Sequence, residues 1–198
     1  MTDPVDDAHA YVIDTSDVTE GVRLVLQSQL FTRIMGGLFP PDLSVPPNAR
    51  VLDLACGPGQ WAIEVAATGP ERCVVGVDLD AGLVRYANAT ARARGHHNLS
   101  FEQMDLKAGL DFPNASFDVI NGRFLVGFLD PDAWIMLLNA CWHALAPGGV
   151  LILSECEMGI SNSAALQALA GALTRALQQQ GRTFSVDGHS IGIVHQLG

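Results

Sequence analysis

Hydrophobic positions follow two different periods along the chain, and the change falls near residue 50. Four apolar residues recur every four positions before that point: Val22, Leu26, Leu30 and Ile34. This spacing predicts a helix with one apolar stripe. Asp17 and Glu20 are spaced as in a capping box, so we expect the helix to begin there. Residues 1–14 are polar and acidic, and two proline pairs follow the helix. Residues 1–48 therefore form a predicted tail and cap helix.

Beyond this segment, short apolar runs alternate with helical patterns. The predicted strands cover residues 51–55, 73–77, 99–104, 117–121 and 150–153. The predicted helices cover residues 60–68, 81–94, 131–145 and about 163–180. Such alternation is typical of a parallel sheet covered on both faces, because parallel strands need crossover connections. The predicted fold class is α/β, a doubly wound and mostly parallel sheet with an added N-terminal helix.

Composition narrows the class of protein. The chain has 198 residues, of which 48% are hydrophobic, so it can bury a core. A formal net charge of −10 disfavours a nucleic-acid partner. No apolar run reaches the roughly 20 residues of a membrane span. The four cysteines are scattered without a CxxC pair, which predicts buried thiols in a reducing cytoplasm. We therefore expect a soluble cytoplasmic protein without a metal site or a membrane partner.

The strongest local signal is a buried strand, a glycine turn and a helix between Val51 and Ala62. Gly57 and Gly59 allow a tight turn and the close approach of a ligand, and the free N–H groups of the helix point to the same place. The pattern Gly57-x-Gly59-x-x-Ala62 also fits dinucleotide-binding folds. Asp53 argues against a pyrophosphate there, because a carboxylate beside the turn suits a cationic ligand with an ammonium and a sulfonium.

Two further acids end the next two predicted strands. Asp78 lies twenty-one residues after Gly57, the spacing at which an acid accepts hydrogen bonds from ribose hydroxyls. Asp105 follows the third strand, where a carboxylate can accept a hydrogen bond from the exocyclic amine of adenine. Met104 and Leu79 are expected to flank the purine ring with apolar surface.

These segments resemble motifs of the class I S-adenosylmethionine-dependent methyltransferases. The matching segments are Asp53–Gly59, Gly76–Leu79, Met104–Leu106, Phe112–Ile120 and Leu145–Gly149. They occur in the family's order. The resemblance implies a Rossmann-like methyltransferase core in residues 49–198, with S-adenosyl-L-methionine as its cofactor.

The cofactor site expected from these motifs and from the end of the fourth strand has eleven residues. They are Asp53, Ala55, Gly57, Gly59, Asp78, Leu79, Met104, Asp105, Leu106, Asn121 and Arg123. Asn121 is expected to contact the methionine part through its backbone. Arg123 is expected to face cofactor or substrate, the alternative being an ordinary ion pair at the strand end. Asp118 lies early in its strand and is interpreted as structural.

Methyl transfer from a sulfonium is a direct displacement, so the protein mainly aligns the reactants and excludes water. No catalytic residue is predicted, although His189 and Glu155 are candidates if a general base is needed. The segment Asn121-Gly122-Arg123-Phe124 differs from the Asn-Pro-Pro-aromatic signature of family members that methylate nucleobases or amides, so a small-molecule acceptor is favoured. The alternatives are an S-adenosylmethionine-binding protein without catalysis and a nicotinamide-dependent reductase.

The family's sheet usually ends in an antiparallel hairpin beside the fifth strand. Residues 181–198 are too few for another helix and two strands, and the segment from Ser190 predicts a helix. We therefore expect a five-stranded parallel core that is short at its C-terminus and lacks the hairpin. An exposed edge on the strand at residues 150–153 invites association, which predicts a possible homodimer.

Overall fold

The computed structural model describes residues 18–155, 163–179 and 193–196. The helices are α1 (Val18–Ile34), α2 (Gln60–Ala67), α3 (Ala81–Ala93), α4 (Pro131–Ala144) and α5 (Ala164–Gln179), with a short 3-10 turn η1 (Leu125–Gly127). The strands are β1 (Arg50–Leu54), β2 (Cys73–Asp78), β3 (Leu99–Gln103), β4 (Phe117–Arg123), β5 (Leu145–Ser154) and β6 (Ile193–Gln196). The predicted strands and helices are thus confirmed up to residue 179, although β5 begins five residues earlier than expected.

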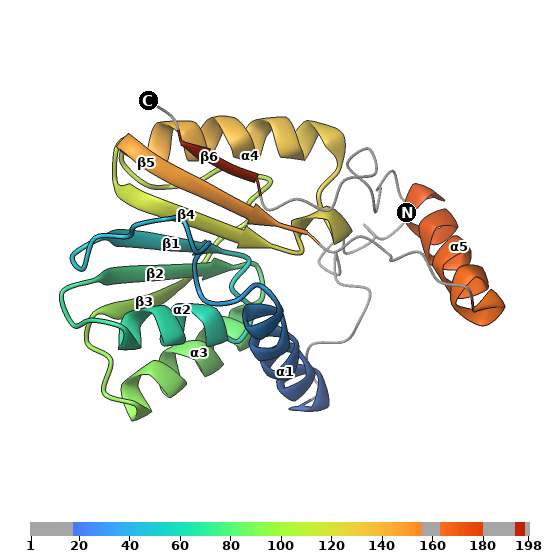
Figure 1. Cartoon of the computed structure of the whole chain (residues 1–198), viewed down its shortest axis with the longest axis horizontal. Helices are drawn as coiled ribbons and strands as arrows, with labels where there is room; N and C mark the ends of the chain where they lie inside the picture. The colour runs from blue at the N-terminus through green and yellow to red at the C-terminus, as the bar shows by residue number, and fades with distance from the viewer. Residues whose placement is uncertain (1–17, 156–162, 180–192, 197–198) are drawn as a thin grey trace, which may run out of the picture.

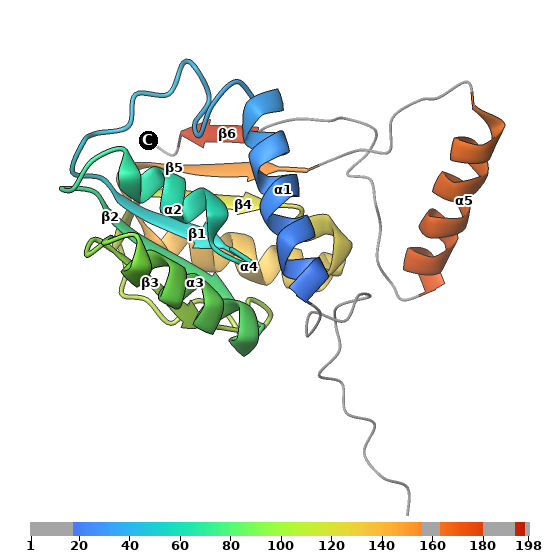
Figure 2. The same ribbon diagram turned by 90° about the horizontal axis from the view of Figure 1, so that it is seen from below.

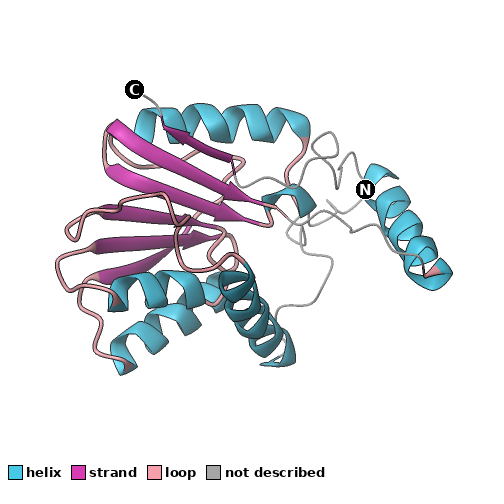
Figure 3. Ribbon diagram, in the orientation of Figure 1, coloured by secondary structure: helices cyan, strands magenta, loops and turns pink. Residues whose placement is uncertain are grey.

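The strands form one sheet in the order β3-β2-β1-β4-β5-β6, in which β1 to β5 are parallel. Helices α2 and α3 cover one face and α4 covers the other, while α5 stands apart from the sheet (Figures 1 and 2). The sheet between its helices is clearest in Figure 3. The predicted doubly wound parallel core of five strands is confirmed.

The end of the chain differs from expectation. Residues 193–196 form strand β6, which pairs antiparallel with Val150–Leu153 of β5, so the helix predicted there is wrong. The β-branched residues Ile193 and Val194 favour a strand, and the edge of β5 supplies backbone partners that a short isolated helix lacks. The prediction that this part of β5 is exposed is therefore also wrong. The exposed edge of β5 therefore no longer supports a homodimer, which stays a prediction.

Alternation along the strands decides which side chains reach the site. On β1, Val51 packs in the core on the α2 and α3 side, whereas Leu52 packs on the α4 side. On β4, Val119 and Ile120 divide in the same way. Because side chains on a strand point to opposite faces with a period of two, Asp53, Asn121 and Arg123 share the face with Val51 and Val119.

Helix α1 crosses the carboxyl ends of the strands (Figure 2). Its predicted apolar stripe faces outward, with Val22, Leu26, Leu30 and Ile34 exposed by 54%, 60%, 56% and 69%. The other side of the helix packs inward through Glu20 and Phe31, which are buried. Helix α1 therefore uses a partly polar face to cover the sheet edge, and hydrophobic periodicity alone did not reveal this.

Three smaller expectations concern cysteines, membranes and metals. Cys56, Cys73 and Cys141 are free thiols, but Cys73 is exposed, so the prediction of buried thiols is wrong there. Among the described residues, no helix is long and apolar enough to cross a membrane. Within the same part of the chain, no group of His, Cys, Asp or Glu side chains is arranged to hold a metal ion.

Candidate functional site

The turn between β1 and α2 uses backbone conformations that favour glycine. Gly57 and Gly59 have φ of +56° and +78°, and Ala55 has φ of +48° despite its Cβ. The Cys56 N–H donates to the Val77 carbonyl at 2.9 Å, which ties the turn to β2. A Cβ on Gly57 would meet no atom within 4 Å. The turn therefore leaves open space at Gly57, where a ligand can approach the backbone.

Gly59 serves a different purpose from Gly57. A Cβ at Gly59 would lie 2.4 Å from the Phe101 ring, and a Cβ at Gly76 would lie 2.5 Å from the same ring. The Phe101 side chain, which is 5% exposed, thus fills the space that both glycines leave between α2 and the sheet. The sequence pattern grouped Gly59 with the ligand-binding residues, but its immediate contact is with the core.

The Asp78 carboxylate is built into the turn. Its Oδ2 accepts from the Gly57 N–H at 2.7 Å and its Oδ1 accepts from the Asp80 N–H at 2.9 Å. Asp78 is only 2% exposed, and burial raises the pKa of its carboxyl although backbone hydrogen bonds oppose the shift. An ionised carboxylate oxygen can accept more than one hydrogen bond. Asp78 can therefore hold the turn and still accept hydrogen bonds from hydroxyls of a ligand.

A second buried carboxylate lies at Asp53, on the α2 side of β1. Its Oδ1 accepts from Asn121 Nδ2 at 2.8 Å. Burial raises the pKa of Asp53 to about 6, opposed by the charge of Arg123 and the Asn121 hydrogen bond, while the Asp78 charge raises it further. Two desolvated acids this close to one turn favour a cationic ligand over an anionic one.

The residues expected around the purine ring have mixed surroundings. Leu79 is 42% exposed at the end of β2, and Met104 is half-buried after β3. Asp105 is exposed, and its Oδ1 accepts from the Lys107 N–H at 2.9 Å. Leu106 is 6% exposed and packs in the core on the α4 side. Its side chain is thus unsuited to contact a ligand, so any such contact must come from its backbone.

Arg123 points from the end of β4 toward α1. Its Nη2 donates to Ser28 Oγ at 2.8 Å and its Nη1 donates to Thr32 Oγ1 at 3.2 Å. Its guanidinium also lies 5.9 Å from the centroid of the Phe31 ring and 5.8 Å from that of Trp61. In the described part of the chain Arg123 forms no ion pair within 4 Å, although the charges of Asp53 and Glu64 act on it from farther away. Burial lowers the pKa of Arg123.

Two other acids have partners that the sequence left open. Asp118 forms an ion pair with Arg50 at 2.8 Å, in agreement with its structural interpretation. Glu155 follows β5, and its carboxylate accepts from the N–H groups of Leu125 and Val126 at 2.8 and 3.2 Å. Burial raises the pKa of Glu155 to about 7. Glu155 therefore holds η1 against the end of β5.

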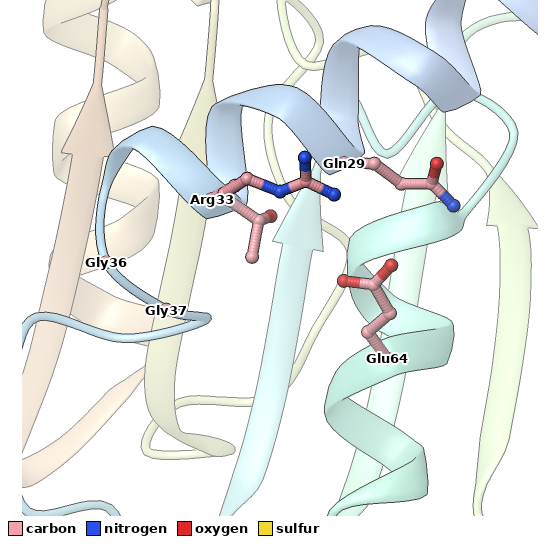
Figure 4. Close-up of a pocket in the computed structure, with 6 residues that line it drawn as sticks. Gln29, Arg33, Gly36, Gly37 and Glu64 are labelled. Atoms are coloured by element: carbon pink, nitrogen blue, oxygen red, sulfur yellow. The ribbon is translucent and has the colours of Figure 1, made fainter.

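Among the described residues, two hollows lie beside α1. The outer one is a polar groove between α1 and α2, in which Gln29 and Arg33 of α1 face Glu64 of α2 (Figure 4). The inner one is a cavity of about 230 Å³ between α1, the segment after it and the ends of β4 and β5. Asn121, Arg123 and Ser154 line the inner cavity together with apolar side chains. The inner cavity therefore adjoins the Asp53 side of the glycine turn through Asn121.

The sequence matches a family described as the methyltransferase domain over residues 51–149. The chain belongs to this methyltransferase family. Aklanonic acid methyltransferase DauC from Streptomyces sp. (strain C5) is 39% identical over 94 residues, which cover 46% of this chain and 42% of that protein. Demethylmenaquinone methyltransferase from Deinococcus radiodurans is 36% identical over 106 residues, which cover 54% of this chain and 42% of that protein. The matched region thus spans less than half the length of these curated relatives.

A SAM dependent methyltransferase from Aquifex aeolicus has a similar solved structure, with a TM-score of 0.60 and 15% identity. The similarity covers 81% of this chain and 87% of that one, and it concerns the fold. The resemblance to S-adenosylmethionine-dependent methyltransferases drawn from the motifs is confirmed by the family match. The site is also compatible with this cofactor, because the backbone at Gly57 is open to a ligand and the buried Asp53 carboxylate suits its positive charges.

Proposed function

We propose that the protein transfers a methyl group from S-adenosylmethionine to a small-molecule acceptor by direct in-line displacement. The observation that carries this proposal is the pairing of two buried carboxylates, Asp53 and Asp78, with the open backbone at Gly57. Asp53 discriminates between the cofactors, because its carboxylate would repel a dinucleotide pyrophosphate and would compensate a sulfonium and an ammonium. It thereby disfavours the nicotinamide-dependent alternative, whereas Asp78 would suit the ribose of either cofactor.

The roles of the cofactor-binding residues follow from their places around the turn. Asp78 would accept hydrogen bonds from the ribose hydroxyls, because its oxygens retain acceptor capacity beside the Gly57 and Asp80 N–H groups. Leu79 and Met104 would flank the adenine, and the exposed Asp105 carboxylate would accept from its amine. Ala55, Gly57 and Asn121 would offer backbone groups, while Gly59 and the Leu106 side chain would act through packing.

When bound, S-adenosylmethionine would supply an electrophilic methyl group, and its thioether would be the leaving group that keeps the electron pair of the carbon–sulfur bond. The chain's contribution is alignment and the exclusion of water. Helix α1 covers the carboxyl edge, and the Trp61 indole N–H donates to the Leu38 carbonyl at 3.0 Å, which fixes one wall. The Glu155 carboxylate already accepts two backbone N–H groups, so we assign it to positioning rather than to general base catalysis. His189 lies outside the described residues.

The proposal of a small-molecule acceptor is supported by the curated relatives. The names of two of them, aklanonic acid methyltransferase and demethylmenaquinone methyltransferase, specify small organic acceptors. The inner cavity of about 230 Å³ is smaller than the roughly 300–1,000 Å³ of typical ligand pockets, which limits the size of an acceptor held there. We also propose a cytoplasmic location, where both the cofactor and such an acceptor would be available.

Calorimetric titration tests the cofactor assignment. We expect S-adenosylmethionine and S-adenosylhomocysteine to bind and NAD not to bind. Asp78→Asn should weaken S-adenosylhomocysteine binding about tenfold or more, because hydrogen bonds to a charged acceptor contribute about 1.5–3 kcal/mol. Asp118→Asn is the matched control, since it removes one carboxylate from the structural ion pair with Arg50 and should leave binding unchanged. Binding of NAD alone would contradict the proposal.

Methyl transfer itself needs a separate measurement. Transfer of a labelled methyl group to any compound in a small-molecule library would separate an enzyme from a cofactor-binding protein without catalysis. Binding of S-adenosylmethionine without transfer to any library compound would favour the second alternative.

A further inference from the structure

The inner cavity has one charged lining residue. Its walls are largely apolar and aromatic, with Phe31, Met35, Phe39, Trp61 and Ile152 among them. Arg123 enters this apolar space from β4, and the lining includes no acidic side chain. A lone guanidinium among aromatic walls suggests a site for an anionic group attached to an apolar body.

The groups in direct contact with the Arg123 guanidinium are neutral. Two hydroxyls, Ser28 Oγ and Thr32 Oγ1, accept from its terminal nitrogens, and two aromatic rings lie near its faces. Within the described residues its Nε–H has no hydrogen-bond partner, and the Asp53 carboxylate lies more than 4 Å away. Arg123 is half-buried, and the charges of Asp53 and Glu64 favour its protonated form from beyond ion-pair distance, so its charge is compensated only in part. An anion in the cavity would supply the missing partner.

We propose that this cavity holds the methyl acceptor, and that the acceptor is a small apolar molecule with a carboxylate that Arg123 binds. Arginine suits this group, because its planar fork matches the two oxygens of a carboxylate. The proposal rests on the proposed methyl transfer but concerns a different ligand from the cofactor. Arg123 is therefore assigned to substrate recognition.

The methionine part of the cofactor also carries a carboxylate and is the competing occupant of this cavity. No acidic side chain lines the cavity itself, but Asp53 lies beside it and would compensate the cofactor's ammonium, so the experiment below is designed to separate the two occupants. The two sites share a wall. Asn121 lines the cavity and donates to Asp53 beside the glycine turn at 2.8 Å. An acceptor held by Arg123 would thus lie next to the cofactor rather than in its place.

The experiment uses three acids of increasing size as probes: benzoate, octanoate and 1-naphthoate. Their binding is measured by calorimetry in the presence of saturating S-adenosylhomocysteine, and 1-naphthamide is the neutral analogue of 1-naphthoate. We expect at least one acid to bind, and the amide to bind about tenfold more weakly than its acid because it lacks the charge. Arg123→Met should weaken acid binding about tenfold while S-adenosylhomocysteine affinity stays within about twofold.

Arg33→Met is the matched control. Arg33 lines the outer groove opposite Glu64 (Figure 4) and not the inner cavity. The variant therefore removes one positive charge from α1, the helix that Arg123 contacts, without changing the inner cavity. It should bind the acids as the native protein does. Arg123→Lys keeps the charge without the planar fork and should retain part of the affinity. The comparison of 1-naphthoate with 1-naphthamide uses only the native protein, so a folding defect in Arg123→Met would not affect it.

Three results would overturn the proposal. The first is that the native protein binds none of the three acids although it binds S-adenosylhomocysteine. The second is equal affinity for 1-naphthoate and 1-naphthamide. The third is that acid and S-adenosylhomocysteine compete, or that Arg123→Met weakens only S-adenosylhomocysteine, either of which would assign the carboxylate to the methionine part. If the native protein does not bind S-adenosylhomocysteine at all, the result would instead contradict the proposed function.

Discussion

At the β1–β2 half of the sheet edge, the charged groups are the buried carboxylates of Asp53 and Asp78, whereas at the β4–β5 half the charged group is the half-buried Arg123 guanidinium. Asp78 is held by backbone N–H groups of the turn and of Asp80. Arg123 is held by side chains of α1, which lie 91 and 95 positions earlier in the chain. Both halves border the same site, but they hold their charges by different means.

The difference has a consequence for rigidity. Backbone donors in a short turn are fixed once β1 and β2 have paired, so the position of Asp78 follows from the sheet. The position of Arg123 requires α1 to dock across the edge, because Ser28, Thr32 and Phe31 all belong to that helix. Disturbing the first half should therefore affect the core, and disturbing the second half should affect the attachment of α1.

The largest expected effect concerns the glycine turn. Gly59→Ala should destabilise the fold by about 3–5 kcal/mol, because the left-handed backbone at φ +78° disfavours alanine and its Cβ would lie 2.4 Å from the Phe101 ring. Gly57→Ala should cost only about 1–2 kcal/mol, since its Cβ would meet no atom within 4 Å. Urea denaturation of both variants measures the difference.

The same two variants separate packing from ligand approach. Gly57→Ala should keep the fold and still lose affinity for S-adenosylhomocysteine, because its methyl group would occupy the open space at the turn. Equal destabilisation by both variants would contradict the distinction between Gly57 and Gly59.

The glycine turn also shows what the sequence could predict. The order of strands and helices, the turn and the acids at the strand ends follow from local spacing, and the structure has them where the spacing predicts. The role of Gly59 was incomplete because its contact, Phe101, comes from β3 and no local pattern links the two. The partners of Arg123 were missed for the same reason, since they lie on α1.

Two further differences have physical causes that a local pattern does not contain. The segment around Ile193 and Val194 has a helix-like sequence pattern, but the free edge of β5 supplies a partner for a strand. The apolar stripe of α1 suggests a buried face, yet the helix turns Ser28 and Thr32 toward the Arg123 guanidinium instead. For α1 a tertiary partner overrode the local pattern, and for β6 a tertiary partner selected the strand that the β-branched residues also favour.

The second prediction concerns pH and the carboxylate half. Burial raises the folded-state pKa of Asp53 from 3.8 to about 6, so its contribution to stability is fully present below pH 3.8 and is lost as pH rises toward 6. Asp53→Asn keeps an oxygen that can accept from Asn121 and removes the charge. At pH 7 this variant should be more stable than the native protein by about 2–3 kcal/mol, with no advantage below pH 4.

Urea denaturation across pH 3.5–7.5 measures this difference, and Asp118→Asn is the control with the opposite sign. The Arg50 side-chain hydrogen bond lowers the pKa of Asp118, so its contribution is present above pH 3.8 and lost as pH falls further. Asp118→Asn should therefore be slightly less stable than the native protein at pH 7. A lower stability of Asp53→Asn at pH 7 would show that the buried carboxylate is stabilising.

The third prediction concerns the guanidinium half. The double variant Ser28→Ala, Thr32→Val removes both hydroxyl acceptors from Arg123 and should destabilise the protein by about 2 kcal/mol, because hydrogen bonds to charged groups contribute more than neutral ones. Limited proteolysis should cut α1 faster in this variant, while the glycine turn keeps its protection. Gln29→Ala, on the exposed side of the same helix, is the control and should change neither. Equal protection of α1 in the double variant would mean that the helix docks without Arg123.

The smallest expected effect distinguishes the two faces of α1. Leu26→Glu and Leu30→Glu change side chains that are 60% and 56% exposed, so each should alter the free energy of unfolding by less than about 0.5 kcal/mol. Phe31→Ala, one residue further on, should cost about 3 kcal/mol, since Phe31 is 9% exposed and its ring packs against Phe124 at 4.6 Å. Urea denaturation of the three variants gives the comparison directly. A loss above about 1 kcal/mol from either glutamate would mean that the stripe is covered in solution by another surface. Such a loss would also make the docking of α1 depend on more than the inward contacts of Phe31, Ser28 and Thr32.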